Sequence, residues 1–314
     1  MRLNLKPFLL LLLSLCSFDV NGQWAFYNQE TPNSLAPRLF APYLISTPYN
    51  ERDFAISPDG TELYFTLQYT ATRSIIVYTR YTNGYWSLIK PVPFSSGQAD
   101  LEPALSADGN TLFFASNRSL TGTAKDFDIW FVDRPQGGSW GEPKLVGGGI
   151  NSPGNEFYPS IAKNGNLYFT SERGGGKGGE DIWMSSFVNG QYNTPESLPV
   201  AINSIRGEYN AFIDPDEQFI YFSSDGRSDA IGGGDLYISR KGANGTWQPA
   251  GRLNFNSAQL DYCPYVASNG NYLFFTSTRP VEIASNGNPL DLVDVLHQVL
   301  SPNNNQGNLY WAKR

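Results

Sequence analysis

Short apolar runs rich in aromatic residues recur along the chain, and polar turns separate them. Five of these runs share one pattern: an aliphatic residue, two aromatic residues, then small residues, mostly with hydroxyl groups. Runs of this length and composition predict β-strands rather than helices. They occupy residues 63–66, 112–116, 167–171, 220–224 and 273–277.

Each aromatic run is preceded by another apolar segment and a tight turn. The turn ends in Asp-Gly or Asn-Gly in four copies and in Asp-Glu in the remaining copy. Asp-Gly and Asn-Gly suit turns that need a positive φ, so each pair of segments is predicted to form a β-hairpin. The turns end at residues 60, 109, 165, 217 and 270, which are 49, 56, 52 and 53 residues apart. This spacing predicts a repeat architecture of strand-rich units.

Two further strands are predicted in each unit. The third is an apolar segment near residues 75–78, 128–131, 181–184, 235–238 and 308–311. The fourth follows a glycine turn at residues 84–86, 138–140, 190–192 and 245–247, and a proline comes soon after each of them. Because proline cannot donate a ladder hydrogen bond, we expect the fourth strand at the outer edge of its sheet.

Four-stranded units of this length are typical of the blades of a β-propeller. The fifth unit lacks a fourth strand after Trp311, and residues 36–40 resemble a lone outer strand that could complete it. The sequence therefore predicts an all-β fold with five four-stranded blades, the last closed by an N-terminal strand. A six-bladed ring is the alternative, but residues 23–50 are too few to supply another blade. The expected repeats span residues 51–98, 99–153, 154–205, 206–258, and 259–314 together with 34–45.

The N-terminus has the pattern of a secretory signal peptide. Arg2 and Lys6 precede an apolar run that is too short to span a bilayer, and Gly22 is small enough for a cleavage site. We expect residues 1–22 to be removed and residues 23–314 to form one exported domain, periplasmic or secreted, without an integral membrane segment. Acylation of Cys16 is the less favoured alternative, because the large Leu15 precedes it.

Composition agrees with an exported all-β protein and narrows its partners. The chain has 314 residues, with 31 Gly, 21 Pro and only 16% charged residues. Its formal net charge is −7, which argues against nucleic acid or an anionic membrane surface as a partner. After signal removal Cys263 would be the single cysteine, and its place in an apolar strand predicts a buried small side chain.

The repeats resemble a known family at several positions. The residues that carry the resemblance are the Ser-Pro-Asp-Gly turn at 57–60, the Leu-Tyr-Phe-Thr-Ser strand at 167–171 and the Asp-Ile-Trp strand at 181–183. They look like the WD-repeat-like propeller of the TolB type, over nearly all of residues 51–279 and again at 308–311. The resemblance implies a binding module, often part of an envelope assembly, but the separate N-terminal domain of TolB is missing here.

An acidic residue stands nine positions before the end of each hairpin turn, at the predicted start of the innermost strand. These residues are Glu51, Asp100, Glu156, Glu208 and Asp261. One interpretation is a carboxylate ring at the mouth of the central channel, which would bind a cation or a basic ligand group. The other is structural, because an arginine follows the second strand in four units, at positions 118, 173, 227 and 279. A feature repeated in every blade favours the structural interpretation.

Other motifs lack the context that their chemistry needs. The glycine-rich loops at 174–179 and 232–234 precede strands, whereas a phosphate site needs a helix N-terminus. The G-x-S-x-G match at 137–141 lies in a hairpin turn and not in a nucleophile elbow. His297 is the only histidine, which excludes histidine-cluster metal sites. It belongs to an insertion at 280–307 with helical spacing, predicted to cap the propeller or, alternatively, to dock a partner.

The sequence thus favours a non-catalytic exported propeller without cofactor or metal. It would bind an envelope protein, a peptide or a glycan on the face that carries the loops between strands two and three and between successive blades. The alternative is a glycan-active hydrolase or lyase that uses two carboxylates of the ring.

Overall fold

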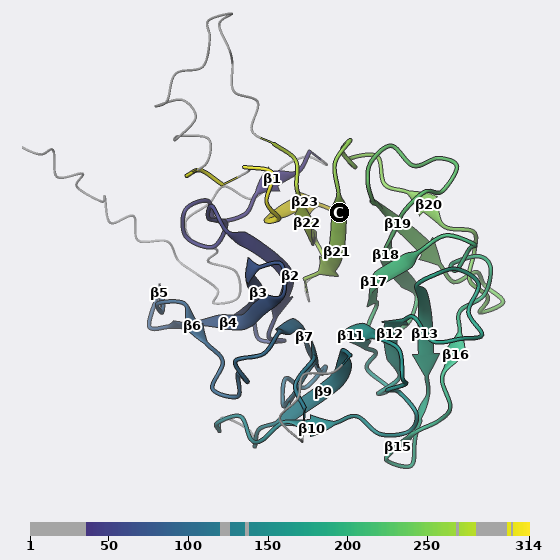
Figure 1. The fold of residues 1–314 in the computed structure, drawn as a ribbon, viewed down its shortest axis with the longest axis horizontal. Helices are drawn as coiled ribbons and strands as arrows, with labels where there is room; N and C mark the ends of the chain where they lie inside the picture. Colours follow the sequence, from purple (N-terminus) through teal and green to yellow (C-terminus); the bar gives the residue numbers. More distant parts are fainter. Residues whose placement is uncertain (1–35, 120–125, 136–137, 268–269, 281–299, 303) are drawn as a thin grey trace, which may run out of the picture.

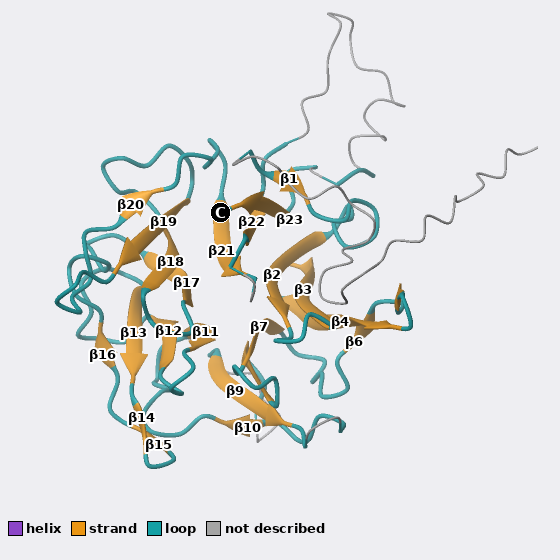
Figure 2. Ribbon diagram, turned by 180° about the vertical axis from the view of Figure 1, so that it is seen from behind, coloured by secondary structure: helices purple, strands orange, loops and turns teal. Residues whose placement is uncertain are grey.

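The computed structural model describes residues 36–119, 126–135, 138–267, 270–280, 300–302 and 304–314. Five small antiparallel sheets surround a central axis, as the two opposite views in Figures 1 and 2 show. The predicted five-bladed propeller is therefore confirmed. The predicted signal peptide with Cys16, and His297 with most of its insertion, lie outside the described residues.

Strands A, B, C and D denote the order from the axis outward in each blade. The A strands are β2 (Asn50–Ile56), β7 (Asp100–Leu105), β11 (Glu156–Ile161), β17 (Glu208–Ile213) and β21 (Asp261–Val266). The B strands are β3 (Glu62–Thr70), β8 (Thr111–Ser116), β12 (Leu167–Ser171), β18 (Phe219–Ser224) and β22 (Tyr272–Ser277). The C strands are β4 (Arg73–Thr82), β9 (Asp128–Asp133), β13 (Asp181–Ser185), β19 (Asp235–Arg240) and β23 (Asn308–Lys313).

The D strands differ from the sequence prediction. They are the two-residue strands β6 (Lys90–Pro91), β10 (Lys144–Leu145), β16 (Glu196–Ser197), β20 (Gly251–Arg252) and, for blade 5, β1 (Arg38–Leu39). In the first four blades the D strand thus begins a few residues after the segment predicted for it. That segment instead continues the hairpin from the far end of strand C, as β5 (Tyr85–Trp86) does on β4 and β15 (Gln191–Tyr192) does on β14 (Phe187–Val188). The chain must turn back before it can pair beside the middle of strand C, and this delays the D strand.

Ring closure occurs as the sequence predicts. Strand β1 pairs antiparallel with β23, with Arg38 opposite Trp311 and Leu39 opposite Tyr310. Phe40 follows this strand and is fully buried against Phe54 of blade 1 and Phe274 of blade 5. The N-terminal strand therefore joins the last blade to the first.

The hydrophobic core lies between blades. One cluster joins blades 1 and 2 through Tyr64, Phe94 and Trp130, and another joins blades 2 and 3 through Phe113, Phe169 and other apolar residues. Corresponding clusters lie between the remaining pairs of neighbouring blades. The two faces of each blade are thus buried against its neighbours, which explains why the B strands are nearly continuous apolar runs.

Candidate functional site

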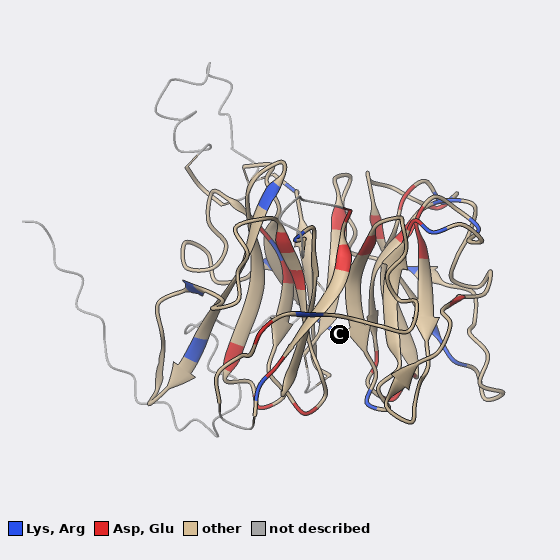
Figure 3. Cartoon of the chain, turned by 60° about the horizontal axis from the view of Figure 1, so that its bottom comes forward, with Lys and Arg blue, Asp and Glu red and all other residues tan. Residues whose placement is uncertain are grey.

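The five acids predicted from the repeat lie at the start of the five A strands. All five are buried, with at most 1% of the residue exposed. Figure 3 shows acidic positions gathered toward one end of the inner strands. Each carboxylate accepts the backbone N–H of the residue four positions before it, in the loop that enters the blade. The donors are Thr47, Ser96, Ser152, Ser204 and Ser257.

Four of these acids form an ion pair inside their own blade. The N–O distances are 2.7 Å for Arg118 and Asp100, 3.1 Å for Arg173 and Glu156, 3.0 Å for Arg227 and Glu208, and 2.8 Å for Arg279 and Asp261. Each guanidinium also lies over one aromatic ring of strand B and one of strand C. This is the arrangement that the structural interpretation expects, and it leaves these carboxylates inside the blades.

Glu51 is different because blade 1 lacks the partners found in the other blades. Leu67 stands opposite it where the other blades have serine, and Tyr69 occupies the position of the arginine. Its carboxylate is bonded by the hydroxyl and the N–H of Thr47, and no Lys or Arg of the described residues lies within ion-pair distance. Burial raises the pKa of Glu51 to about 7.

A second ring of residues lies two positions after the acids, and here the side chains differ from blade to blade. Each A strand has a β-bulge, and the residue at the bulge has a positive φ between 48° and 61°. A bulge re-aims a side chain relative to a regular strand. The residues are Asp53, Glu102, Tyr158, Asn210 and Cys263, and all are buried.

These bulge residues form one polar network around Arg52. The Nε of Arg52 lies 2.8 Å from Asp53 Oδ1, and its Nη2 lies 2.9 Å from Glu102 Oε1. Glu102 also accepts the N–H of Tyr158 at 2.7 Å, and Cys263 donates its thiol to Asp53. Asn210 of blade 4 donates its Nδ2–H to Glu102 Oε1 at 3.3 Å, so the network links all five blades across the axis.

Burial and neighbouring charges shift the pKa values of the groups in this network. Burial opposes the charged form of Arg52, but Asp53 and other neighbours raise its pKa well above the usual value. Burial and the nearby Asp53 raise the pKa of Glu102. Burial also raises the pKa of the Cys263 thiol well above its usual range. One guanidinium balances one carboxylate, and the raised pKa of Glu102, about 8, favours the neutral form of the second carboxyl group at pH 7.

Sequence reasoning found the regular ring of acids and missed the bulge ring. The signal that could have found it is the contrast within the repeat, because one position is always acidic while the position two residues later carries varied polar groups. Cys263 is buried as predicted, but it faces a carboxylate as well as apolar neighbours.

The glycine-rich loops are braced by the aspartates that follow them. Asp181 accepts the N–H of Lys177 and of Gly178, and Asp235 accepts the N–H of Ile231. A Cβ on Gly178 would lie 1.8 Å from the carbonyl oxygen of Arg206, so the loop packs against backbone where a side chain cannot fit. Both loops thus serve tight packing.

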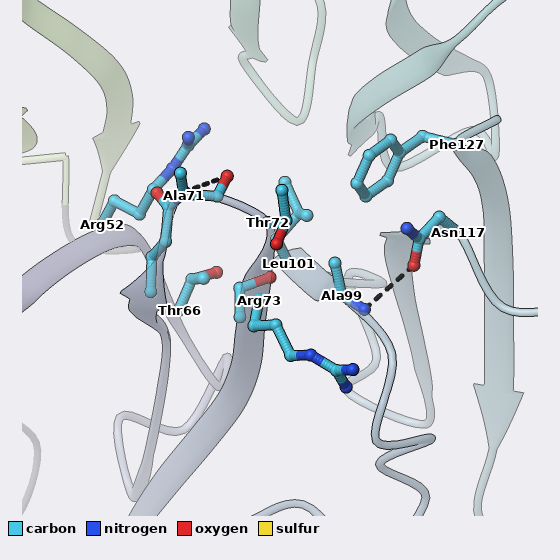
Figure 4. Close-up of a pocket in the computed structure, with 11 residues that line it drawn as sticks. Arg52, Thr66, Ala71, Thr72, Arg73, Ala99, Leu101, Asn117 and Phe127 are labelled. Carbon is cyan, nitrogen blue, oxygen red and sulfur yellow. Dashed lines mark hydrogen bonds between the residues drawn. The ribbon is translucent and has the colours of Figure 1, made fainter. Parts of the chain in front are cut away.

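A cavity of about 200 Å³ opens beside the network, between blades 1 and 2. Figure 4 shows Arg52 on one side of it, Phe127 and Asn117 on the other, and Thr72 between them. Arg73 and Ser74 come from the start of strand C in blade 1, and Leu101 from strand A of blade 2. The cavity lies on the face that carries the loops from B to C and from D to A.

In the described part of the protein, no cluster of three or more His, Cys, Asp or Glu side chains could hold a metal ion. No helix in the same residues is long and apolar enough to cross a membrane.

Comparison with known proteins supports the fold. No protein-family model and no curated protein matches the sequence. A putative TolB from Agrobacterium tumefaciens is similar with a TM-score of 0.50 and 15% identity, over 85% of this chain and 91% of that one. The structure of a complex of BT0996 with RGII gives a TM-score of 0.53 and 8% identity, over 90% and 92%.

TolB from Acinetobacter baumannii gives a TM-score of 0.48 and 15% identity, over 85% of this chain and 55% of that one. This chain therefore spans about half of that TolB. Similarity at these identities concerns the fold, and the expected TolB-like propeller fold is confirmed.

Proposed function

We propose that this protein is an exported, non-catalytic propeller that binds a ligand at the mouth of its channel, on the face between blades 1 and 2. The cavity beside Arg52 carries the proposal, because its walls hold polar side chains with hydrogen-bonding capacity left over. The partner is an envelope protein, a peptide or a glycan, as the TolB-like fold and the predicted signal peptide suggest. N-terminal sequencing of the protein from an envelope fraction tests the export, with Gln23 expected as the first residue.

Exposed apolar side chains on the same face favour a binding role. At the rim of blade 1, Tyr49 is 61% exposed and Tyr69 is 50% exposed. Ile205 is 82% exposed in the loop that enters blade 4. Exposed apolar residues mark an interaction surface where they gather into a patch. Tyr49 and Tyr69 adjoin the paired residues Asn50 and Gln68, so these two tyrosines are the relevant group.

The carboxylates argue against the hydrolase alternative. Four ring acids are paired with arginines, and Asp53 and Glu102 are both bound to Arg52. A glycoside hydrolase needs one carboxyl group to donate a proton and a second to act as base or nucleophile at the sugar. Here the guanidinium of Arg52 is bound to both channel carboxyl groups, so neither is free to act as the acid or as the base or nucleophile.

A binding screen with a blocking substitution tests this proposal. The purified protein is screened against a glycan array and against envelope extracts, with reducing ends measured in parallel. Thr72→Trp places a bulky ring at the exposed edge of the cavity and should abolish retention of the ligand. Thr246→Trp is the matched control, because Thr246 is exposed in a turn on the opposite face.

Two outcomes would count against the proposal. Equal retention by Thr72→Trp and wild type would place the binding site elsewhere. Release of reducing ends that Glu102→Gln abolishes would show that the protein is a hydrolase.

A further inference from the structure

The cavity between blades 1 and 2 is rich in hydrogen-bond donors that lack an acceptor. Arg73 uses one Nη to donate to the carbonyl of Gly97 at 2.6 Å, and its other nitrogens have no partner among the described residues. The Nδ2 of Asn117 also lacks a partner there, because only its Oδ1 is engaged, by the N–H of Ala99. These donors lie on different walls of the same space.

Ser74 gives independent support for a ligand. It is 4% exposed, lines the cavity, and its hydroxyl has no hydrogen-bond partner within the described ranges. An unmade bond of a buried hydroxyl costs free energy unless a ligand or water completes it. Thr66 adds a hydroxyl that accepts the N–H of Glu102 at 3.0 Å and keeps its own proton for another acceptor.

The charge of the cavity is the opposite of the charge of the protein. No Asp or Glu lines it, and of its two arginines Arg52 is paired with Asp53 and Glu102, whereas Arg73 has no ion-pair partner among the described residues. The whole chain has a net charge of −7. The cavity therefore favours an anionic ligand group, and a guanidinium is well suited to a carboxylate.

The apolar part of the lining limits the ligand further. Phe127, Leu101 and Ala99 form one wall, opposite Arg52 in Figure 4. The volume of about 200 Å³ is smaller than the ~300–1,000 Å³ of pockets for drug-sized ligands. A single ring fits this size, with an apolar face toward Phe127 and acceptors around its edge.

We propose that this cavity binds a carboxylate-bearing sugar ring, a uronic acid residue of an anionic glycan. The carboxylate lies against Arg73, and the hydroxyl oxygens around the ring accept hydrogen bonds from Asn117, Ser74 and Thr66. A sugar acid carries acceptors around its whole perimeter, whereas an acidic peptide side chain carries them at one end only. This proposal rests on the proposed binding function and names the ligand class of the same site.

Calorimetric titration of the full-length protein with hexuronic acids and with their methyl esters tests the proposal. The probes are glucuronate, galacturonate and mannuronate, and each ester keeps the ring and hydroxyls while removing the charge. We expect the best free acid to bind at least about tenfold more tightly than its ester. Arg73→Gln should remove this preference and Ser74→Ala should weaken binding, while the exposed Arg206→Gln on the same face should change neither.

The outcomes separate this inference from the broader function. Binding of neutral sugars or acidic peptides at the cavity, blocked by Thr72→Trp but indifferent to the carboxylate of the sugar, overturns the uronate assignment and leaves the binding function intact. Absence of any ligand in the sugar titrations, on the array and in the envelope extracts overturns both.

Discussion

At the scale of the residue, one repeated acid has two characters that depend on its neighbours. In blades 2 to 5 the acid at the start of strand A forms an ion pair with an arginine, whereas Leu67 and Tyr69 occupy the equivalent serine and arginine positions of blade 1. A buried carboxyl group without a cation is easier to protonate. The acid at this position is therefore part of an ion pair in blades 2 to 5, and it titrates near neutral pH in blade 1.

Glu51→Gln should change how stability depends on pH. The pKa of Glu51 rises from 4.5 to about 7 on folding, so the folded state holds the proton more tightly. Its stabilising contribution is then full below pH 4.5 and is lost as pH rises through 7. From about pH 5 to pH 8, the free energy of unfolding measured with urea should fall less for the variant than for the wild type. The difference should be on the order of 1–3 kcal/mol.

The exposed Glu142→Gln serves as the control for this comparison and should keep the wild-type slope. Identical slopes for Glu51→Gln and wild type would show that Glu51 does not titrate in this range.

At the scale of the element, the bulge in each A strand decides what reaches the channel. It places one residue of every blade at positive φ, and these residues build the network around Arg52. A straight strand would alternate its side chains regularly. The placement of the polar side chains in the channel therefore depends on a backbone bulge that all five blades share.

Cys263→Val should be less stable than Cys263→Ala, by about 1–3 kcal/mol, because a β-branched residue is strained at positive φ. Cys263 has φ 53° and is fully buried. Both variants remove the thiol contact with Asp53, so the difference isolates the backbone and the added volume. Urea unfolding at about pH 7 measures it, and a Val variant as stable as the Ala variant would contradict the positive φ at this position.

At the scale of the whole molecule, the ring is closed by a strand of only two residues and the aromatic residue after it. Strand β1 pairs with β23, and Phe40 then contacts the rings of Phe54, Phe274 and Trp311 at centroid distances of 5.2–5.6 Å. The hydrogen bonds in this closure are few, so its strength comes mainly from aromatic packing.

Phe40→Ala should lower the free energy of unfolding by about 3–5 kcal/mol, as expected for a fully buried phenylalanine. Hydrogen exchange should quicken first in β23, which loses the cover of β1. Leu88→Ala is the control, because Leu88 is 84% exposed and should change stability by less than about 0.5 kcal/mol. Unchanged exchange in β23 would mean that the closure does not depend on Phe40.

The sequence by itself determined the number of blades, the order of strands A to C, the closing strand and the ring of acids. A pattern of apolar runs and turns is a local property of the chain, and every repeat carries it, so five copies indicate the same strands. It placed the D strands too early, because the position of an edge strand depends on where the chain turns back across the sheet. It also left the pairing of each acid open, since Arg118 and Asp100 meet only through the register of two strands.

The tertiary structure alone decided the candidate site. Glu102, Tyr158 and Cys263 occupy the same position in different repeats and are distant in sequence, and only ring closure brings them next to Arg52. The cavity likewise lies between two blades, where residues 52, 73 and 127 converge. A repeat pattern specifies one blade at a time, whereas a site on the axis or between blades exists only after the blades have packed.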